Sequence, residues 1–182
     1  MCKDENNLIK RLTLSDSEAF KILFFKYQPV LFKFVYFKTY DDNLAQDIVQ
    51  EVFLKVWLNR TSLKPELSFF SYLAKISTNL IKDHFKRLKV REKHKDSIPQ
   101  IKPSIFDNPE DALDFKILQE QIQFIANRYL SETCRIIFFL SRIENKSNPE
   151  IAEMLGISNK KVENQLYNAL KVLRKKLKQS SK

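Results

Sequence analysis

The chain of 182 residues contains a single glycine, Gly156. Average usage of about 7% would give a protein of this length about a dozen. Tight β-hairpins need turn residues with positive φ, and glycine adopts that conformation at the lowest cost. A chain with one glycine and 15 Phe is short of hairpin turns and rich in apolar side chains. We therefore predict an all-α fold.

The chain has 32 Lys and Arg but only 22 Asp and Glu, which gives it a formal net charge of +10. This excess favours nucleic acid as the partner, with an anionic membrane surface as the second class. The first ten residues mix acids and bases, and the longest purely apolar run is residues 136–140. We therefore expect no signal peptide, no membrane-spanning helix and a cytoplasmic location.

No motif indicates catalysis, a metal or a cofactor. Cys2 and Cys134 lie far apart without a CxxC pair, which indicates plain thiols, with Cys134 in the core. His84 and His94 lack clustered Cys, Asp or Glu at metal-binding spacing. We expect a protein that is not an enzyme and binds no cofactor and no metal.

Apolar residues recur with a helical period along most of the chain. Ser15 and Glu18 fit a capping box that opens a helix, which we expect to be distorted at Pro29. Further helices are predicted at 43–59 and 68–90, and from Pro109 (capped by Asn108), Glu132, Pro149 and Ser158. The 68–90 helix would bury Phe69, Phe70, Leu73, Ile76, Leu80, Ile81 and Leu88.

Residues 93–112 lack this periodicity and contain three prolines, which is typical of a flexible linker. We therefore predict two small helical domains, at 1–92 with three helices and at 113–182 with four. The 43–59 helix has one apolar stripe for the core. Its opposite stripe mixes acids with leucines: Asp47, Glu51, Leu54 and Leu58.

The segment NPEIAEMLGISNKKVENQLYNALKVLRKKL, residues 148–177, has the anatomy of a helix-turn-helix. Ala152 is small where a second helix crosses closely, Gly156 can take the positive φ that ends the first helix, and Ser158 can cap the second. An ordinary helix stop explains Gly156 alone, but it does not explain the joint pattern.

The last helix, projected at about 100° per residue, separates an apolar side from a cationic, amide-bearing side. Lys can donate to guanine and Asn can pair with adenine in the major groove. The predicted DNA-reading residues are Ser158, Asn159, Lys160, Lys161, Asn164, Gln165, Asn168 and Lys171. The alternative is a solvated basic helix.

Three blocks in order carry a resemblance to a known family: DIVQEVFLKVW at 47–57, SFFSYLAKISTNLIKDHFKR at 68–87 and LSETCRIIFFLSRIENKSNPEIAEMLGIS at 130–158. The chain resembles the extracytoplasmic-function sigma factors of the sigma-70 family, whose region 2 and region 4 the two domains would represent. The resemblance implies a noncatalytic subunit that directs core RNA polymerase to promoters and helps to melt DNA.

The resemblance also implies roles for individual residues. Asp47, Gln50, Glu51 and Leu54 match the positions that dock on the clamp coiled coil of the polymerase. The helix after residue 68 would line the melted minus-10 element with Tyr72, Lys75, Asn79, Lys82 and Lys86, and the loop 61–67 would hold a flipped base. The helix from Ser158 would read the minus-35 element. The implied partners are the clamp and flap of the polymerase, promoter DNA and an inhibitory, membrane-embedded anti-sigma factor.

Two departures from the family pattern affect the C-terminal domain. The sequence NKSNPEIA replaces a glycine-containing approach to the helix-turn-helix, and KKVENQ stands where Thr-Val-Lys is frequent. The second departure places Glu163 beside DNA, where its charge repels phosphate unless it points to a cytosine amine or back to a lysine.

Two other functions compete with this interpretation. A stand-alone helix-turn-helix regulator would bind its promoter without polymerase. A helical adaptor or enzyme with basic faces would serve acidic proteins or nucleotides and would be indifferent to DNA sequence.

Overall fold

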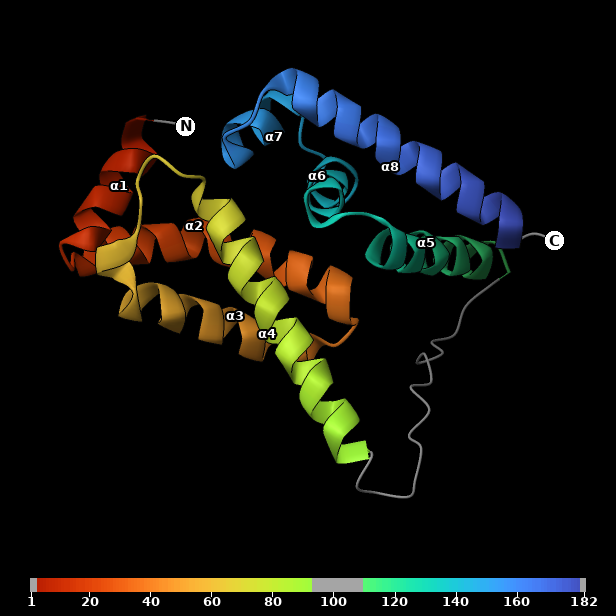
Figure 1. The fold of residues 1–182 in the computed structure, drawn as a ribbon, viewed down its shortest axis with the longest axis horizontal. Coiled ribbons are helices and arrows are strands. Elements are labelled where there is room, and N and C mark those ends of the chain that lie inside the picture. The colour runs from red at the N-terminus through yellow and green to blue at the C-terminus, as the bar shows by residue number, and fades with distance from the viewer. Residues whose placement is uncertain (1–2, 93–109, 181–182) are drawn as a thin grey trace.

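The computed structural model describes residues 3–92 and 110–180, and every regular element in these ranges is helical (Figure 1). The elements are α1 (Lys3–Thr13), α2 (Ser17–Thr39), α3 (Asp42–Leu58), a 3₁₀ turn η1 (Arg60–Ser62), α4 (Phe69–Glu92), α5 (Glu110–Tyr129), α6 (Glu132–Arg142), α7 (Asn148–Leu155) and α8 (Asn159–Ser180). The predicted all-α fold is confirmed. Most of the predicted linker 93–112, and the predicted cap Asn108, lie outside the described residues.

The N-terminal half is built around α2, which packs against α1, α3 and α4. Aromatic rings fill this core: Phe20 meets Trp57 edge-on at 5.2 Å between ring centroids, and Phe34 meets Phe70 at 6.3 Å. Phe69 and Phe70 are buried, as expected. The helix α1 was not predicted; it buries Ile9 and Leu12 and contacts η1 as well as α2.

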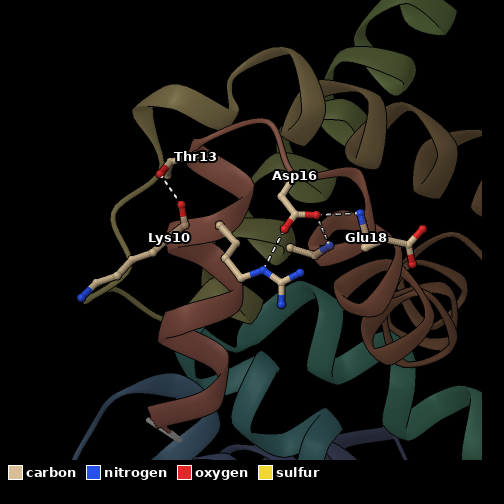
Figure 2. A network of polar contacts seen from close by, with 6 residues as sticks. Lys10, Thr13, Asp16 and Glu18 are labelled. Carbon is tan, nitrogen blue, oxygen red and sulfur yellow. Dashed lines mark hydrogen bonds and ion pairs between the residues drawn. The ribbon is translucent and has the colours of Figure 1, made fainter.

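The junction between α1 and α2 corrects the predicted cap (Figure 2). The residue that caps α2 is Asp16, whose carboxylate accepts hydrogen bonds from the backbone N–H groups of Glu18, at 2.9 Å, and Ala19, at 3.1 Å. Arg11 donates to the same carboxylate at 2.7 Å. Ser15 takes the left-handed conformation, with φ 67°. The predicted Ser15–Glu18 box was therefore wrong, because the carboxylate one residue later caps the helix and also binds Arg11.

Pro29 does not end α2, which runs from Ser17 to Thr39 with Pro29 inside it. The carbonyl that Pro29 leaves without its helical donor belongs to Phe25, which is 66% exposed, so water can reach this part of the helix. Leu88 was expected in the core but is 36% exposed, because the C-terminal end of α4 projects beyond the helices that cover its first part (Figure 1).

Residues 110–180 of the C-terminal half form four helices, as predicted, with α8 packed against α5, α6 and α7. The core of this half includes Ile137, Phe139 and Leu140 from α6, Ile151 from α7 and Val162 from α8, all at 0% exposure. In the described ranges, no helix is both long enough and apolar enough to cross a membrane.

Candidate nucleic-acid interface

The first helix of the helix-turn-helix, α7, begins with a capping box. The Ser147 side chain accepts from the backbone N–H of Glu150, and the Glu150 carboxylate accepts from the backbone N–H of Ser147 at 2.8 Å. The Ser147 hydroxyl also donates to the Glu150 carboxylate, at 2.5 Å, and the two hydrogen bonds that this carboxylate accepts from Ser147 hold its pKa below the usual value. Pro149 occupies the first turn, where a missing N–H costs nothing. The sequence analysis placed Pro149 here but did not identify Ser147.

The turn between α7 and α8 is closed by Gly156 in the left-handed conformation, with φ 63°. The N–H of Ile157 donates to the carbonyl of Ala152 at 3.0 Å, which satisfies one of the carbonyls left free at the end of α7. Ser158 then accepts from the N–H of Lys161 at 3.2 Å and caps α8. The predicted helix stop and the predicted cap are both confirmed.

The approach to α7 also contains a left-handed residue, although it lacks a glycine. Asn145 has φ 51°, and it lies in the NKSN segment that departs from the family pattern. Asparagine tolerates this conformation better than most residues. The departure therefore preserves a left-handed turn before the helix-turn-helix.

The helix α8 is amphipathic, as predicted. Val162, Ala169 and Leu173 are buried on its inner side. On the outer side, seven of the eight predicted DNA-reading residues are exposed: Ser158, Asn159, Lys160, Lys161, Asn164, Asn168 and Lys171. Gln165 is half-buried, and its backbone carbonyl accepts the thiol hydrogen of Cys134 at 3.3 Å. The exposed row can lie in a major groove without moving any part of the core.

Cys134 is a buried core thiol, as predicted, at 4% exposure. Burial raises the pKa of this thiol above its usual value. Its contact with Gln165 joins α6 to the middle of α8. Cys134 therefore helps to position α8 and is poorly suited to redox chemistry.

Glu163, the acid within the basic row, points back to a lysine. Its carboxylate lies 3.3 Å from the Nζ atom of Lys160. Both side chains remain largely exposed. Through this contact the Glu163 carboxylate is directed toward its own helix, and the pair reduces the net positive charge at the first turn of α8.

Two residues of the outer row were missed in the sequence analysis. Tyr167 is 68% exposed, and Arg174 is also exposed. The helical projection places both on the outer face, within about 40° of Lys160. The projection alone could therefore have identified them. An exposed tyrosine there offers an apolar surface and a hydroxyl to a DNA groove.

A second polar row follows α4. Lys75, Asn79, Lys82 and Lys86 are exposed, and Tyr72 is half-buried at the start of the row. Burial raises the pKa of the Tyr72 hydroxyl, which remains a neutral donor at physiological pH. Because the five predicted residues are spaced three or four positions apart, they lie along one side of the helix.

A pocket of about 210 Å³ opens at the beginning of this row. It is lined by the loop before α4, by Tyr72 and by α1: Ile9, Ser62, Leu63, Lys64, Leu67, Ser68, Phe69 and Tyr72. The predicted loop 61–67 thus contributes to one pocket together with the first residue of the row. The contribution of Ile9 could not be predicted, because α1 was not.

The loop is held in place by Arg60. Its Nε atom donates to the Ser15 hydroxyl at 2.9 Å, and its guanidinium lies 4.5 Å from the centre of the Trp57 ring. A second nitrogen donates to the carbonyl of Trp57 at 2.6 Å. These contacts fix the loop to the end of α3 and to the α1–α2 turn, so the pocket has a preformed wall.

The mixed stripe of α3 is exposed over its whole length. Asp47, Gln50 and Glu51 are exposed, and Leu54 and Leu58 are 56% and 64% exposed. Glu51 pairs with Lys55, one turn later, at 3.4 Å. Exposed leucines among acids form a surface that a partner protein can bury.

An apolar groove of about 370 Å³ lies on the C-terminal half. Residues of α5, α6 and α8 form most of it, and Phe37 of α2 contributes from the N-terminal half. Arg142 and Arg174 are the charged residues among its lining. Its dimensions and apolar walls suit the nonpolar side of an amphipathic helix.

Two family models match the chain. The one described as Sigma-70 region 2 matches residues 23–91, and the one described as Sigma-70, region 4 matches residues 128–173. Together they cover more than half of the chain. The first includes the α3 stripe and the α4 row, and the second includes the helix-turn-helix.

Several curated proteins are similar over nearly their whole length. The ECF RNA polymerase sigma factor SigW of Bacillus subtilis is 26% identical, over 93% of this chain and 94% of its own. The ECF RNA polymerase sigma-E factor of Escherichia coli K12 is 25% identical, over 93% and 92%.

Two solved structures share the fold. CnrH in complex with the cytosolic domain of CnrY has a TM-score of 0.58 at 20% identity, covering 96% of this chain and 97% of that one. The sigma factor RpoE of Bartonella quintana, in complex with the anti-sigma factor NepR, has a TM-score of 0.56 at 19% identity, covering 87% and 96%.

Proposed function

Because this chain belongs to the extracytoplasmic-function sigma factors of the sigma-70 family, we propose that separate surfaces on its two halves bind core RNA polymerase and read a promoter. The observation that carries this proposal is the pair of exposed polar rows, one on α4 and one on α8, each positioned by a different half. A stand-alone regulator would need only the second row.

The row on α8 reads the minus-35 element as a duplex. Its first turn presents Lys160 and Asn164, whose side chains can bind base edges in the major groove. Lys171, farther along, holds phosphates. Tyr167 adds an apolar contact between them, suited to a thymine methyl group.

The row on α4 binds the opened minus-10 strand. Lys75, Lys82 and Lys86 follow the phosphate backbone, and Asn79 hydrogen-bonds a base. The adjacent pocket of about 210 Å³ receives a base turned out of the stack. Tyr72, which lies both in the pocket wall and in the row, supplies an aromatic surface for stacking.

Two surfaces bind the polymerase. The acid-and-leucine stripe of α3, with Asp47, Gln50, Glu51 and Leu54, docks on the clamp coiled coil. The apolar groove between α5, α6 and α8 receives the flap. The chemistry of RNA synthesis belongs to the polymerase, so this chain is not itself an enzyme. It acts in the cytoplasm, where the polymerase and the promoters are.

An inhibitory anti-sigma factor, embedded in the membrane, completes the proposal. It is supported by two solved structures with the same fold, one of the sigma factor RpoE bound to the anti-sigma factor NepR and one of CnrH bound to the cytosolic domain of CnrY. The exposed leucines of α3 and the apolar groove are surfaces that such an inhibitor can cover.

The test is a run-off transcription assay with core polymerase and a library of promoter templates. We expect transcripts from a subset of templates that share two elements, and none with core polymerase alone. A gel shift on the selected duplex, with and without core polymerase, provides the second readout. Tight, sequence-specific binding of the chain alone, with no promoter-dependent transcript, would establish a stand-alone regulator and refute the proposal.

A further inference from the structure

One acid stands in the row of α8 that faces solvent. Glu163 is the only acidic residue of this helix, and it is surrounded by lysines and amides. Its side chain is 48% exposed and lies 3.3 Å, through Oε2, from the Nζ atom of Lys160, which is 78% exposed. Its Oε1 atom makes no hydrogen bond or ion pair with any residue that the structure describes. An acceptor beside Lys160 is therefore open to a ligand.

Helix stability does not account for this acid. An exposed ion pair between residues three apart on a helix contributes little to folding, because both charges stay hydrated. On a surface that binds phosphates, a carboxylate also weakens binding to every DNA sequence, since it offsets part of the attraction. The acid is explained by a contact that only some DNA sequences provide.

The major groove offers a carboxylate two kinds of partner, because the base groups that donate hydrogen bonds there are the amines of cytosine, N4, and adenine, N6. Lys160 distinguishes between them. Its ammonium group has three hydrogens and accepts none, so it needs base acceptors next to the amine that Glu163 binds. The order of donors and acceptors across each base pair therefore decides which pair fits.

A G·C pair presents two adjacent acceptors, guanine N7 and O6, and then one donor, cytosine N4. Lys160 followed by Glu163 matches this order, because the ammonium group binds both acceptors and the carboxylate binds the donor. An A·T pair presents its donor between two acceptors. On that pair, one acceptor would be left without a donor from Lys160 and Glu163.

The spacing of the two head groups fits the same pair. Guanine O6 and cytosine N4 are partners in a Watson–Crick hydrogen bond, so about 2.9 Å separates them. The corresponding separation between Lys160 and Glu163 is 3.3 Å. Both side chains can therefore bind their base groups while they stay paired. They lie at the N-terminal end of α8, the part of a recognition helix that meets base edges.

We propose that Lys160 and Glu163 act together to read one G·C pair of the minus-35 element. Lys160 donates to guanine O6 and N7, and Glu163 accepts from cytosine N4, so the two residues contact both strands. The inference rests on the proposed function, because it uses the assignment of α8 to the minus-35 duplex. It makes Glu163 a specificity-determining residue, which lowers affinity for other sequences and so increases discrimination.

The promoter library tests the base-pair preference. With core polymerase, the wild-type chain should select templates that share a G·C pair at one minus-35 position. Glu163→Ala should reduce discrimination at this position alone, by about 5- to 150-fold, and should increase the transcript from templates that lack the pair. Glu153→Ala removes an exposed acid from α7, outside the row, and is the matched control for the loss of one negative charge. It should leave the selection unchanged.

Modified bases test the individual contacts. N4-methylcytosine carries a methyl group in place of the N4 hydrogen that faces the groove, and 7-deazaguanine lacks the N7 acceptor. In the selected promoter, each analogue should weaken binding of the wild-type chain with core polymerase by about 5-fold or more, as measured by fluorescence anisotropy. The Glu163→Ala protein should be insensitive to N4-methylcytosine, and the Lys160→Ala protein to 7-deazaguanine, because each variant has already lost the contact.

The outcomes separate this inference from the proposed function. Promoter-dependent transcripts with no fixed G·C pair, or a Glu163→Ala protein that keeps wild-type discrimination and sensitivity to N4-methylcytosine, would overturn the inference and leave the function intact. If no protein gives a promoter-dependent transcript, but the full chain alone selects duplexes with a G·C pair that depends on Glu163, the base-pair contact stands and the assigned function fails. Absence of both transcription and duplex binding would overturn both.

Discussion

The substitution Gly156→Ala measures what the turn of the helix-turn-helix demands of its backbone. The φ of Gly156 is 63°, a conformation in which a Cβ atom costs about 1 to 2 kcal/mol. The new Cβ would meet its nearest neighbour, the Cβ of Ser68, at 3.9 Å, which is ordinary van der Waals contact. Backbone strain is therefore the whole expected cost, about 1 to 2 kcal/mol of unfolding free energy.

The assay is denaturant unfolding of the full chain followed by the helical circular dichroism signal. In a thermal unfolding experiment on the same variant, a loss of about 1 to 2 kcal/mol corresponds to a fall of roughly 2 to 8 °C in Tm for a chain of this size. Gly156→Asn should cost less, because asparagine tolerates the left-handed region. Asn145→Ala, at the other left-handed turn of this module, should also cost less than Gly156→Ala, because the asparagine already carries part of the strain. A loss well above 3 kcal/mol would show a steric collision, and no loss would show that the turn is not left-handed; either result refutes the reasoning.

Three further predictions concern the binding surfaces and acid stability. Lys160→Ala with Asn164→Ala should weaken binding at the cognate minus-35 element by about 1 to 3 kcal/mol per lost base contact while core binding is unchanged, as measured by fluorescence anisotropy and run-off transcription. Asp47→Ala with Glu51→Ala should do the reverse, seen mainly as slower, less salt-sensitive association with core polymerase; loss of duplex binding instead would contradict the assignment. Hydrogen bonds from the backbone of Ala19 and from Arg11 hold the pKa of Asp16 below 3.8, so its stabilising effect is present above that pH and is lost as pH falls through the lowered value. Asp16→Asn should accordingly make acid unfolding less steep, and an unchanged pH profile of stability would exclude this role.

The faces of the long helices could be predicted because helical periodicity decides which side is buried. In α3, Ala45, Ile48 and Val52 are buried and Leu54 is exposed, as the projection indicates. The same argument placed the rows of α4 and α8 on the surface. It needs only the sequence, since each helix is long enough for its apolar residues to form a continuous stripe.

Features that depend on tertiary contacts could not be predicted. The helix α1 is short and mostly polar, and Ile9 is buried only because α2 and η1 meet it there. Ser15 and Asp16 are adjacent, and both are good capping residues, so the sequence alone does not decide which of them caps α2. The hydrogen bond from Asn127 to the carbonyl of Phe37 joins a side chain that is common on protein surfaces to a backbone group that every residue has, so no pattern in the sequence marks it.

A single glycine does not limit this chain to a single left-handed turn. Glycine does end α7 with positive φ, but Ser15, Tyr40 and Asn145 take positive φ as well in the described part of the chain. A left-handed residue of another type costs little enough for the rest of the fold to offset. Glycine scarcity therefore predicted the helical class correctly, but it did not predict how many left-handed turns the chain contains.

The Phe139 ring belongs to two cores, since it fills the interior of its own half and also seats the opposite half. A substitution at such a position has little freedom, because a smaller side chain would weaken the interior of one half and its contact with the other half together. Changes are easier at the rim, where Lys33 and Glu144 lie 3.1 Å apart and join the halves without supporting either interior. Relatives of this chain should therefore differ at the rim and share the aromatic centre.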